Sequence, residues 1–198
     1  MEDFKTLLER AAATHGHLCA GQVLGIRMAL AGCREVGIQD PRGADRKKLY
    51  VVVEIDRCAT DAIATVTGCT LGKRTLRWVD YGVMAATFLN LETGKAVRVV
   101  AREEARVLAD ARVPPDGKRD RYARQLEAYQ VMPEEELFTF QEVALTVPPE
   151  DLPGRPLRRV QCQACGEWVQ DGRDVVRDGR TLCRGCAHGR YYRVLEKR

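Results

Sequence analysis

Four cysteines near the carboxyl end constrain the fold of this 198-residue chain more than any other feature. They form two Cys-X-X-Cys pairs with seventeen residues between them: Cys162, Cys165, Cys183 and Cys186. A zinc ion binds four thiolates in a tetrahedron at about 2.3 Å, and each pair supplies two of them from a tight turn. Between the pairs, Asp178-Gly179 is typical of a hairpin turn. The spacing therefore predicts a structural zinc ion in a zinc-ribbon-like module, rather than free dithiols or a redox pair.

A proline-rich stretch separates this module from the rest of the chain. It contains four prolines: Pro148, Pro149, Pro153 and Pro156. Such proline density is typical of a linker. We therefore expect a core domain over residues 1–150, a linker over 151–158 and a zinc-binding domain over 159–198. A piece of roughly 40 residues buries too little apolar surface to be stable alone, so the metal is expected to supply folding free energy.

A second group of metal-binding side chains lies near the amino end. The stretch His15-Gly16-His17-Leu18-Cys19 places two of the three histidines and a thiol within five residues. Imidazole and thiolate together suit Zn²⁺ and other first-row transition metals. Cys19 is expected at the start of a helix, where backbone N–H groups favour a thiolate. The alternative is a connecting loop with two solvated histidines and a small buried cysteine.

Two further cysteines are expected at the ends of core elements. Residues 48–55 are rich in β-branched and aromatic side chains, which predicts a strand, and Cys58 follows it. A short helix is expected over 62–67, ended by Gly68, and Cys69 comes next. Thiols in loops at the ends of core elements are more common in functional sites than in packing. The predicted centre thus contains His15, His17, Cys19, Cys58 and Cys69.

Asp61 and Lys73 are charged residues close in sequence to these thiols. Asp61 can accept a hydrogen bond from a metal-bound imidazole, or it can cap the helix. Lys73 can lower the pKa of a neighbouring thiol or hold an anionic ligand. If the centre is catalytic, the candidate catalytic residues are Cys19, Asp61 and Lys73. Cys33 falls inside a helix and is expected to be a small core residue.

The spacing of apolar residues predicts helices and strands throughout the first 150 residues. Helices are expected over 3–13, 20–36, 102–111 and 119–130, and further strands over 83–91, 96–100 and 137–147. The second helix carries a strip of small residues: Gly21, Gly25, Ala29 and Gly32. Each helical glycine costs about 0.5–1 kcal/mol relative to alanine. So many in one helix indicate that another backbone, or a ligand, approaches it closely.

Composition places the chain among soluble globular proteins. Hydrophobic residues make up 45% and charged residues 30%, and no apolar run approaches the ~20 residues of a membrane helix. The charged amino end lacks the apolar core of a signal peptide, so we expect a cytoplasmic protein, in which eight cysteines indicate metal ligands or reactive thiols. Residues 155–198 carry a net charge of +6 and the rest −2. That basic tail permits nucleic-acid contact without requiring it.

Several separated motifs together resemble the FmdE family, which is related to one of the subunits of formylmethanofuran dehydrogenase. The motifs are HGHLCAG over 15–21, Gly25 and Arg27, Cys58-Ala-Thr-Asp61-Ala62, Thr67-Gly-Cys69-Thr70-Leu-Gly-Lys73 and Asp80-Tyr81-Gly82. The resemblance covers about residues 1–147, and Ala20 departs from it because the family usually has proline there. It implies an α+β core with a mainly antiparallel sheet, a homodimer, and a metal-associated groove lined by the motif histidines and cysteines. It also implies a molybdenum or tungsten formylmethanofuran dehydrogenase-type enzyme as partner.

Three functions follow from these observations. The favoured one is a metal-binding accessory protein or subunit of such a redox system, with zinc in the tail and zinc or another first-row transition metal in the core. The second is a stand-alone enzyme that uses an activated thiol or a metal. The third is a zinc-finger regulator that binds nucleic acid or protein. For the tail, a solvated dimerisation or capping module is favoured over nucleic-acid binding, because its arginines are scattered rather than concentrated.

Overall fold

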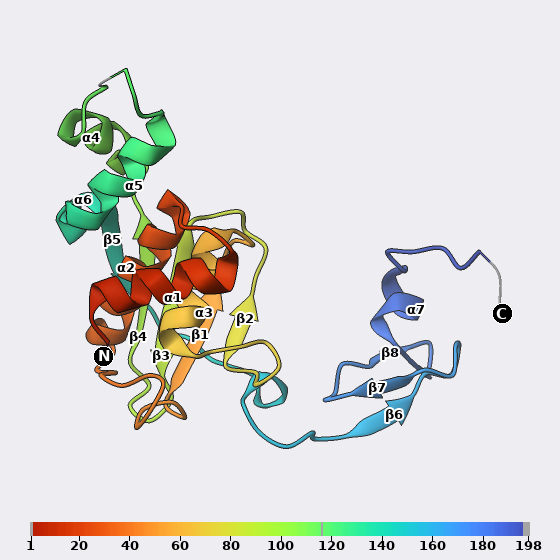
Figure 1. Cartoon of the computed structure of the whole chain (residues 1–198). Helices are drawn as coiled ribbons and strands as arrows, with labels where there is room; N and C mark the ends of the chain where they lie inside the picture. Colours follow the sequence, from red (N-terminus) through yellow and green to blue (C-terminus); the bar gives the residue numbers. More distant parts are fainter. Residues whose placement is uncertain (1, 116, 196–198) are drawn as a thin grey trace. The chain divides into compact units, whose positions relative to one another are not determined.

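The computed structural model describes residues 2–115 and 117–195. The chain divides into two compact units, Met1–Thr146 and Val147–Arg198 (Figure 1). The first unit holds a five-stranded sheet with helices packed on it, and the second holds two short hairpins and one helix. No helix within the described ranges is long and apolar enough to cross a membrane.

Two consecutive helices begin the first unit. Helix α1 spans Phe4–His15, and Asp3 caps it by accepting a hydrogen bond from the backbone N–H of Thr6. It ends at Gly16, whose positive φ of 94° is a conformation that glycine adopts without strain. Helix α2 spans Ala20–Glu35 and is buried along most of its length. Two residues, His17 and Leu18, are thus all that lies between the end of α1 and the first cap of α2.

A strand–helix–strand unit follows. Strand β1 (Leu49–Val53) leads into helix α3 (Cys58–Thr67), which returns the chain to strand β2 (Leu76–Trp78). Strands β1 and β2 are parallel, as a connection through a helix requires. The residues just after β1 and those just before β2 therefore lie at opposite edges of the sheet.

The remaining pairings of this sheet are antiparallel. Its order is β2-β1-β3-β4-β5, with β3 (Ala85–Asn90) and β4 (Ala96–Ala101) joined as a hairpin and β5 (Phe138–Glu142) at the edge. Helix α2 packs on β3 and β4, and α1 contacts both α2 and α3 (Figure 1). The expected α+β core with a mainly antiparallel sheet is therefore confirmed. Strand β2 was not expected from the sequence.

Three shorter helices lie at one end of this sheet (Figure 1). They are α4 (Ala105–Arg112), α5 (Arg121–Val131) and α6 (Glu134–Leu137). Helix α5 packs against α2, and Arg27 of α2 joins them by donating to the backbone carbonyls of Tyr129 and Met132. Burial lowers the pKa of the Arg27 guanidinium. Arg27, one of the family motif residues, thus holds helices together.

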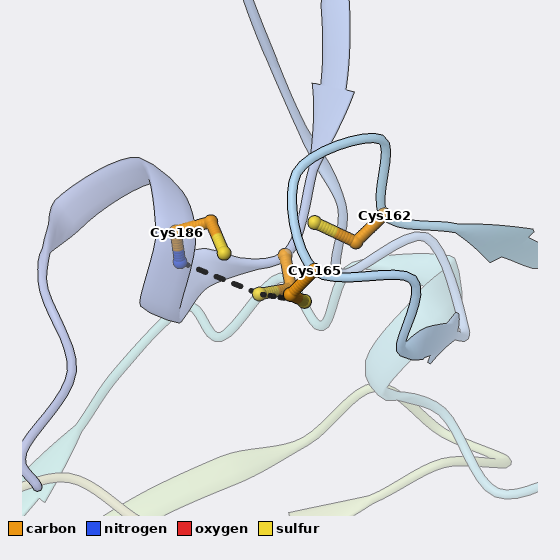
Figure 2. A group of neighbouring side chains, drawn as sticks. Cys162, Cys165 and Cys186 are labelled. Atoms are coloured by element: carbon orange, nitrogen blue, oxygen red, sulfur yellow. Dashed lines mark hydrogen bonds between the residues drawn. The ribbon is translucent and has the colours of Figure 1, made fainter. Parts of the chain in front are cut away.

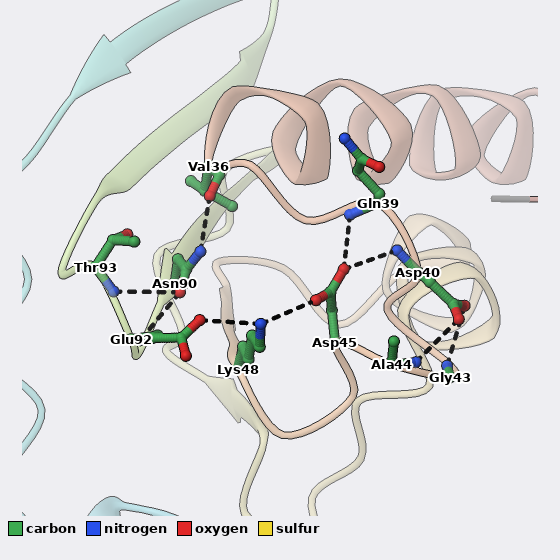
Figure 3. Close-up of polar contacts among 10 residues, drawn as sticks. All are labelled: Val36, Gln39, Asp40, Gly43, Ala44, Asp45, Lys48, Asn90, Glu92 and Thr93. Carbon is green, nitrogen blue, oxygen red and sulfur yellow. Dashed lines mark hydrogen bonds and ion pairs between the residues drawn. The ribbon is translucent and has the colours of Figure 1, made fainter.

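Polar contacts fix the loop between α2 and β1 (Figure 3). The carboxylate of Asp45 accepts hydrogen bonds from the backbone N–H groups of Gln39 and Asp40 at 3.0 Å each. Asn90 donates to the carbonyl of Val36 at the end of α2. Lys48 makes ion pairs with both Asp45 and Glu92. These contacts tie the end of α2 to the β3–β4 hairpin.

The second unit is small and has a very limited apolar core. Its buried core residues are Cys162, Leu182 and Ala187. A 3-10 turn, four strands and one helix make up the unit: η1 (Pro149–Asp151), β6 (Arg159–Gln161), β7 (Trp168–Gln170), β8 (Val175–Arg177), β9 (Arg180–Leu182) and α7 (Arg184–His188). Strands β6 and β7 form one hairpin, and β8 and β9 form another that turns at Asp178-Gly179, as expected.

Candidate metal centres

The four cysteines of the second unit come together in one cluster. The sulfur atoms of Cys162, Cys165, Cys183 and Cys186 all lie within 4.8 Å of one another. Figure 2 shows Cys162, Cys165 and Cys186 directing their sulfurs toward a common point. The measured separation between the sulfurs of Cys165 and Cys183 is 3.9 Å. Tetrahedral zinc with bonds of about 2.3 Å places its sulfurs about 3.8 Å apart, so this donor set fits a zinc ion.

Backbone N–H groups surround these sulfurs. The sulfur of Cys183 caps helix α7 by accepting from the backbone N–H of Cys186 at 3.3 Å. Hydrogen bonds from the backbone of Cys183, and then of Cys165 and Ala164, lower the pKa of Cys162 to about 6. At neutral pH this cluster therefore already presents a thiolate to a metal.

Arg190 also contacts this cluster, which sequence reasoning missed. Its guanidinium donates to the sulfur of Cys186 at 3.6 Å and lies over the ring of Tyr192. No feature of the sequence distinguishes Arg190 from the other arginines of the tail. The fold brings it to the sulfur because Gly189 turns the chain back after α7.

The amino-terminal histidines and Cys19 form a second cluster. One ligand atom from each of His15, His17 and Cys19 lies within 4.8 Å of the other two, and the two imidazole centroids are 5.0 Å apart. The α1–α2 junction makes this arrangement. His15 is the last residue of α1, Gly16 reverses the chain, and Cys19 is the extended residue that precedes α2.

Close packing of α2 on α3 brings Cys58 to this cluster. A Cβ added to Gly25 would lie 2.5 Å from the carbonyl oxygen of Ala59, so only glycine lets the two backbones approach so closely. Cys58, the first residue of α3, makes a side-chain hydrogen bond with Cys19. Burial, followed by this hydrogen bond, raises the pKa of the Cys58 thiol. The small-residue strip of α2 thus sets the spacing of the two thiols.

Asp61 holds the first histidine of the cluster. Its carboxylate oxygen lies 2.9 Å from Nδ1 of His15, and the two side chains come from different helices. Asp61 does not cap α3, because Arg57 is the capping residue and Asp61 lies in the first turn. With Nδ1 donating to a carboxylate, Nε2 is the nitrogen of His15 that remains for a metal.

Cys69 and Lys73 lie away from this cluster. Cys69 follows the last turn of α3, whereas Cys58 begins it, and ten helical residues span about 15 Å. The sulfur of Cys69 faces the carbonyl of Leu49 at 3.8 Å and is 2% exposed, so its surroundings are those of a core residue. Burial raises its pKa, and Lys73 acts on this thiol in the opposite direction. The structure therefore brings together His15, His17, Cys19, Cys58 and Asp61, and leaves Cys69 and Lys73 at the other edge of the sheet.

Two family models match the chain. The model described as FmdE, molybdenum formylmethanofuran dehydrogenase operon, matches residues 14–139. The model described as prokaryotic dksA/traR C4-type zinc finger matches residues 155–192, which include all four clustered cysteines. The zinc-finger match and the sulfur cluster together support structural zinc in the second unit.

Two individual proteins are similar to the chain. A protein of Archaeoglobus fulgidus, named a probable S-adenosyl-L-methionine-binding protein, is 32% identical over 208 residues, covering 96% of this chain and 54% of its own length. The chain thus spans about half the length of that relative. The crystal structure of an FmdE-like protein of tungsten formylmethanofuran dehydrogenase type, from Syntrophus aciditrophicus, has a TM-score of 0.62 at 22% identity, covering 96% of this chain and 95% of the other. That likeness concerns the fold.

Proposed function

This chain belongs to the FmdE family, and we propose that it is a metal-binding accessory protein or subunit of a molybdenum or tungsten redox enzyme system. In this proposal the first unit binds one transition-metal ion through His15, His17, Cys19 and Cys58. The second unit is a zinc finger that gives the protein a separate, structural metal. The single observation that carries the proposal is the convergence of two imidazoles and a thiol at the α1–α2 junction.

The chemistry of the donors supports a metal at this junction. Tetrahedral zinc with nitrogen and sulfur ligands needs neighbouring donors about 3.3–3.8 Å apart, and the three donor atoms here all lie within 4.8 Å of one another. Small side-chain rotations complete such a set. Cys58 contacts Cys19 and supplies the fourth donor. Two imidazoles with two thiolates suit zinc and other first-row metals better than magnesium or calcium, which prefer oxygen ligands.

The contact between Asp61 and His15 supports the same conclusion. Metal-bound imidazoles almost always donate their second ring N–H to a carboxylate, a carbonyl or water. A bound metal would act as a Lewis acid toward any group that displaced one of its ligands. The residues of the chain fix where that group must approach: Asp61 holds the imidazole of His15, and His17 is the exposed member of the cluster.

Metal content of the full chain tests the proposal. Protein purified without added metal is expected to contain two equivalents of transition metal by elemental analysis. Replacing His17 with alanine should remove one equivalent. Replacing His188, which lies in α7 and is the third histidine of the chain, serves as the matched control and should leave both. The proposal fails if the wild-type chain holds one equivalent that disappears in the Cys162→Ser/Cys183→Ser variant.

The partner is the finer part of the proposal. Its support is the description of the family model, which refers to a molybdenum formylmethanofuran dehydrogenase operon, and the name of the similar protein from Syntrophus aciditrophicus, which refers to the tungsten enzyme. The tagged chain, purified from its own cells, should carry molybdenum or tungsten in near-equimolar amount. Elution with neither element above the level of an untagged control would contradict the association.

We also propose that the chain forms a homodimer. Exposed apolar side chains on the first unit support this: Trp78 is 46% exposed, Tyr81 69% and Phe140 38%. Contiguous exposed apolar surface commonly marks an interface. Sedimentation equilibrium should return twice the mass of one chain, 22.2 kDa, and the mass of a single chain at micromolar concentration would refute the dimer.

A further inference from the structure

We propose that Cys19 and Cys58 form a reversible oxidation site that closes to a disulfide when the protein meets a peroxide. The pairing itself follows from the packing of α2 on α3. Its consequence, release of the ion from the first unit, rests on the proposed function above.

The two thiols are already adjacent. Cys58 makes a side-chain hydrogen bond with Cys19, although the two residues are far apart in sequence. Gly21 lies against both of them, since a Cβ built there would be 3.5 Å from Cβ of Cys58 and 3.8 Å from the sulfur of Cys19. A disulfide needs Cβ atoms about 3.5–4.5 Å apart. The bare backbone of α2 at Gly21 leaves the two side chains the room to meet.

Exposure distinguishes this pair from the other thiols of the first unit. Cys19 and Cys58 are both partly exposed, so a small oxidant reaches them from solvent. Cys33 and Cys69 are buried, at 0% and 2% exposure, and face the apolar core. Burial also raises the pKa of Cys33 to about 12, which keeps it in the unreactive thiol form.

The reaction uses hydrogen peroxide as the two-electron oxidant. One thiol attacks the O–O bond, becomes a sulfenic acid and releases water. The second thiol then attacks the sulfenic sulfur, forms the S–S bond and releases a second water. Two thiols are thus oxidised to one disulfide, and one peroxide is reduced to two waters. A dithiol reverses the reaction by exchange through a mixed disulfide.

Oxidation removes both sulfur donors from the proposed metal centre, because the thiolate is the form that binds metal. His15 and His17 alone then remain, and two donors hold zinc far less tightly than four. The ion is therefore expected to leave on oxidation and to return after reduction. The four-cysteine cluster of the second unit provides an internal comparison within the same chain.

Peptide mapping of the full chain under non-reducing conditions tests the proposal. After one equivalent of peroxide, trypsin should yield residues 11–27 linked to residues 58–73. The second peptide contains both Cys58 and Cys69, so Cys69→Ala is the matched control and should keep the link, whereas Cys58→Ser should lose it. Fragmentation of the wild-type linked peptide identifies the bonded sulfur directly, whether or not a variant folds.

Three results would overturn the proposal. They are no link between the two peptides, a link that persists in Cys58→Ser, and a link that fragmentation assigns to Cys69. Elemental analysis of the same samples keeps the two proposals apart. A disulfide in a chain that binds only one metal equivalent would sink the metal centre and leave the oxidation site standing. Two equivalents without the disulfide would do the reverse.

Discussion

At the scale of single residues, Asp61 is the side chain whose role depends most on the metal. It is 59% exposed at the side chain and yet is fixed on Nδ1 of His15. Replacement by asparagine keeps the size but removes the charge that orients the imidazole. We expect about a 10–100-fold loss of zinc affinity at the first unit, as found when such supporting carboxylates are changed. Competition with a chromophoric chelator measures it.

Asp56→Asn is the matched control for this experiment, because Asp56 is also an exposed acid just before α3. Its zinc affinity should equal that of the wild type. Equal affinities for Asp61→Asn and the wild type would show that Asp61 does not support a metal ligand.

A second prediction at this scale concerns pH. Hydrogen bonds from the backbone of Asp40 and Gln39 lower the pKa of Asp45 from its usual 3.8. A carboxyl whose folded pKa lies below its unfolded pKa stabilises the fold above the unfolded value and loses that contribution as pH falls through the folded value. The difference in melting temperature between wild type and Asp45→Asn should thus be largest at neutral pH and should vanish near pH 2. A difference independent of pH would contradict the ion-based account.

Residue types predicted the donors better than their company. The run from His15 to Cys19 identified three donors correctly as neighbours, because five consecutive residues at a helix junction cannot lie far apart. Cys58 and Cys69 looked equivalent in the sequence, since each ends a core element. Only the direction of α3 separates them, and direction is not written in the residues near either thiol. The proximity of Asp61 to His15 was one of two interpretations, and the structure selects it.

At the scale of elements, the contact between α2 and α3 positions the core centre. The four small residues of α2 predicted a close approach, and Gly25 against Ala59 realises it. The ring of Phe88 fills the corresponding space at Gly32 on β3. Strand β2 escaped prediction because three residues carry too little periodicity to distinguish a strand from a loop. Without β2, the parallel connection and its two opposite edges could not be foreseen.

Gly25→Ala tests the role of this contact. The added Cβ would meet backbone and side-chain atoms of Ala59 and Ala62 at 2.5–2.8 Å, so the helices must separate. We expect a loss of about 1–3 kcal/mol in unfolding free energy, typical of overpacking, together with weaker metal binding because Cys19 moves away from Cys58. Gly72→Ala is the control, since its Cβ meets nothing within 4 Å. Denaturant unfolding of both variants decides, and equal stabilities would contradict the account.

At the scale of the whole molecule, the two units should respond differently to chelation. The second unit has three buried core residues, whereas the first has a continuous core of thirty. Removing zinc should therefore unfold residues 159–195, because metal binding supplies their folding free energy. The sheet of the first unit should remain. Hydrogen exchange with and without a strong chelator measures this, and unchanged protection of β6–β9 would show that the second unit does not need its metal.

The domain organisation was the part of the molecule most accessible from sequence, because the prolines around residue 150 and the cysteine spacing are local signals. The sheet order and the opposite placement of Cys58 and Cys69 arise from long-range pairing, which local patterns do not encode. The central claim therefore concerns a long-range meeting, that of the α1–α2 junction with the start of α3.

Anomalous scattering at the zinc edge, from crystals of the full chain grown without chelator, tests that claim most directly. The account predicts two peaks per chain, one among the four cysteines of the second unit and one bonded to His15, His17, Cys19 and Cys58 at about 2.0–2.3 Å. A single peak at the four-cysteine cluster, at full occupancy and with the side chains of His15 and His17 bound to no metal, would contradict it.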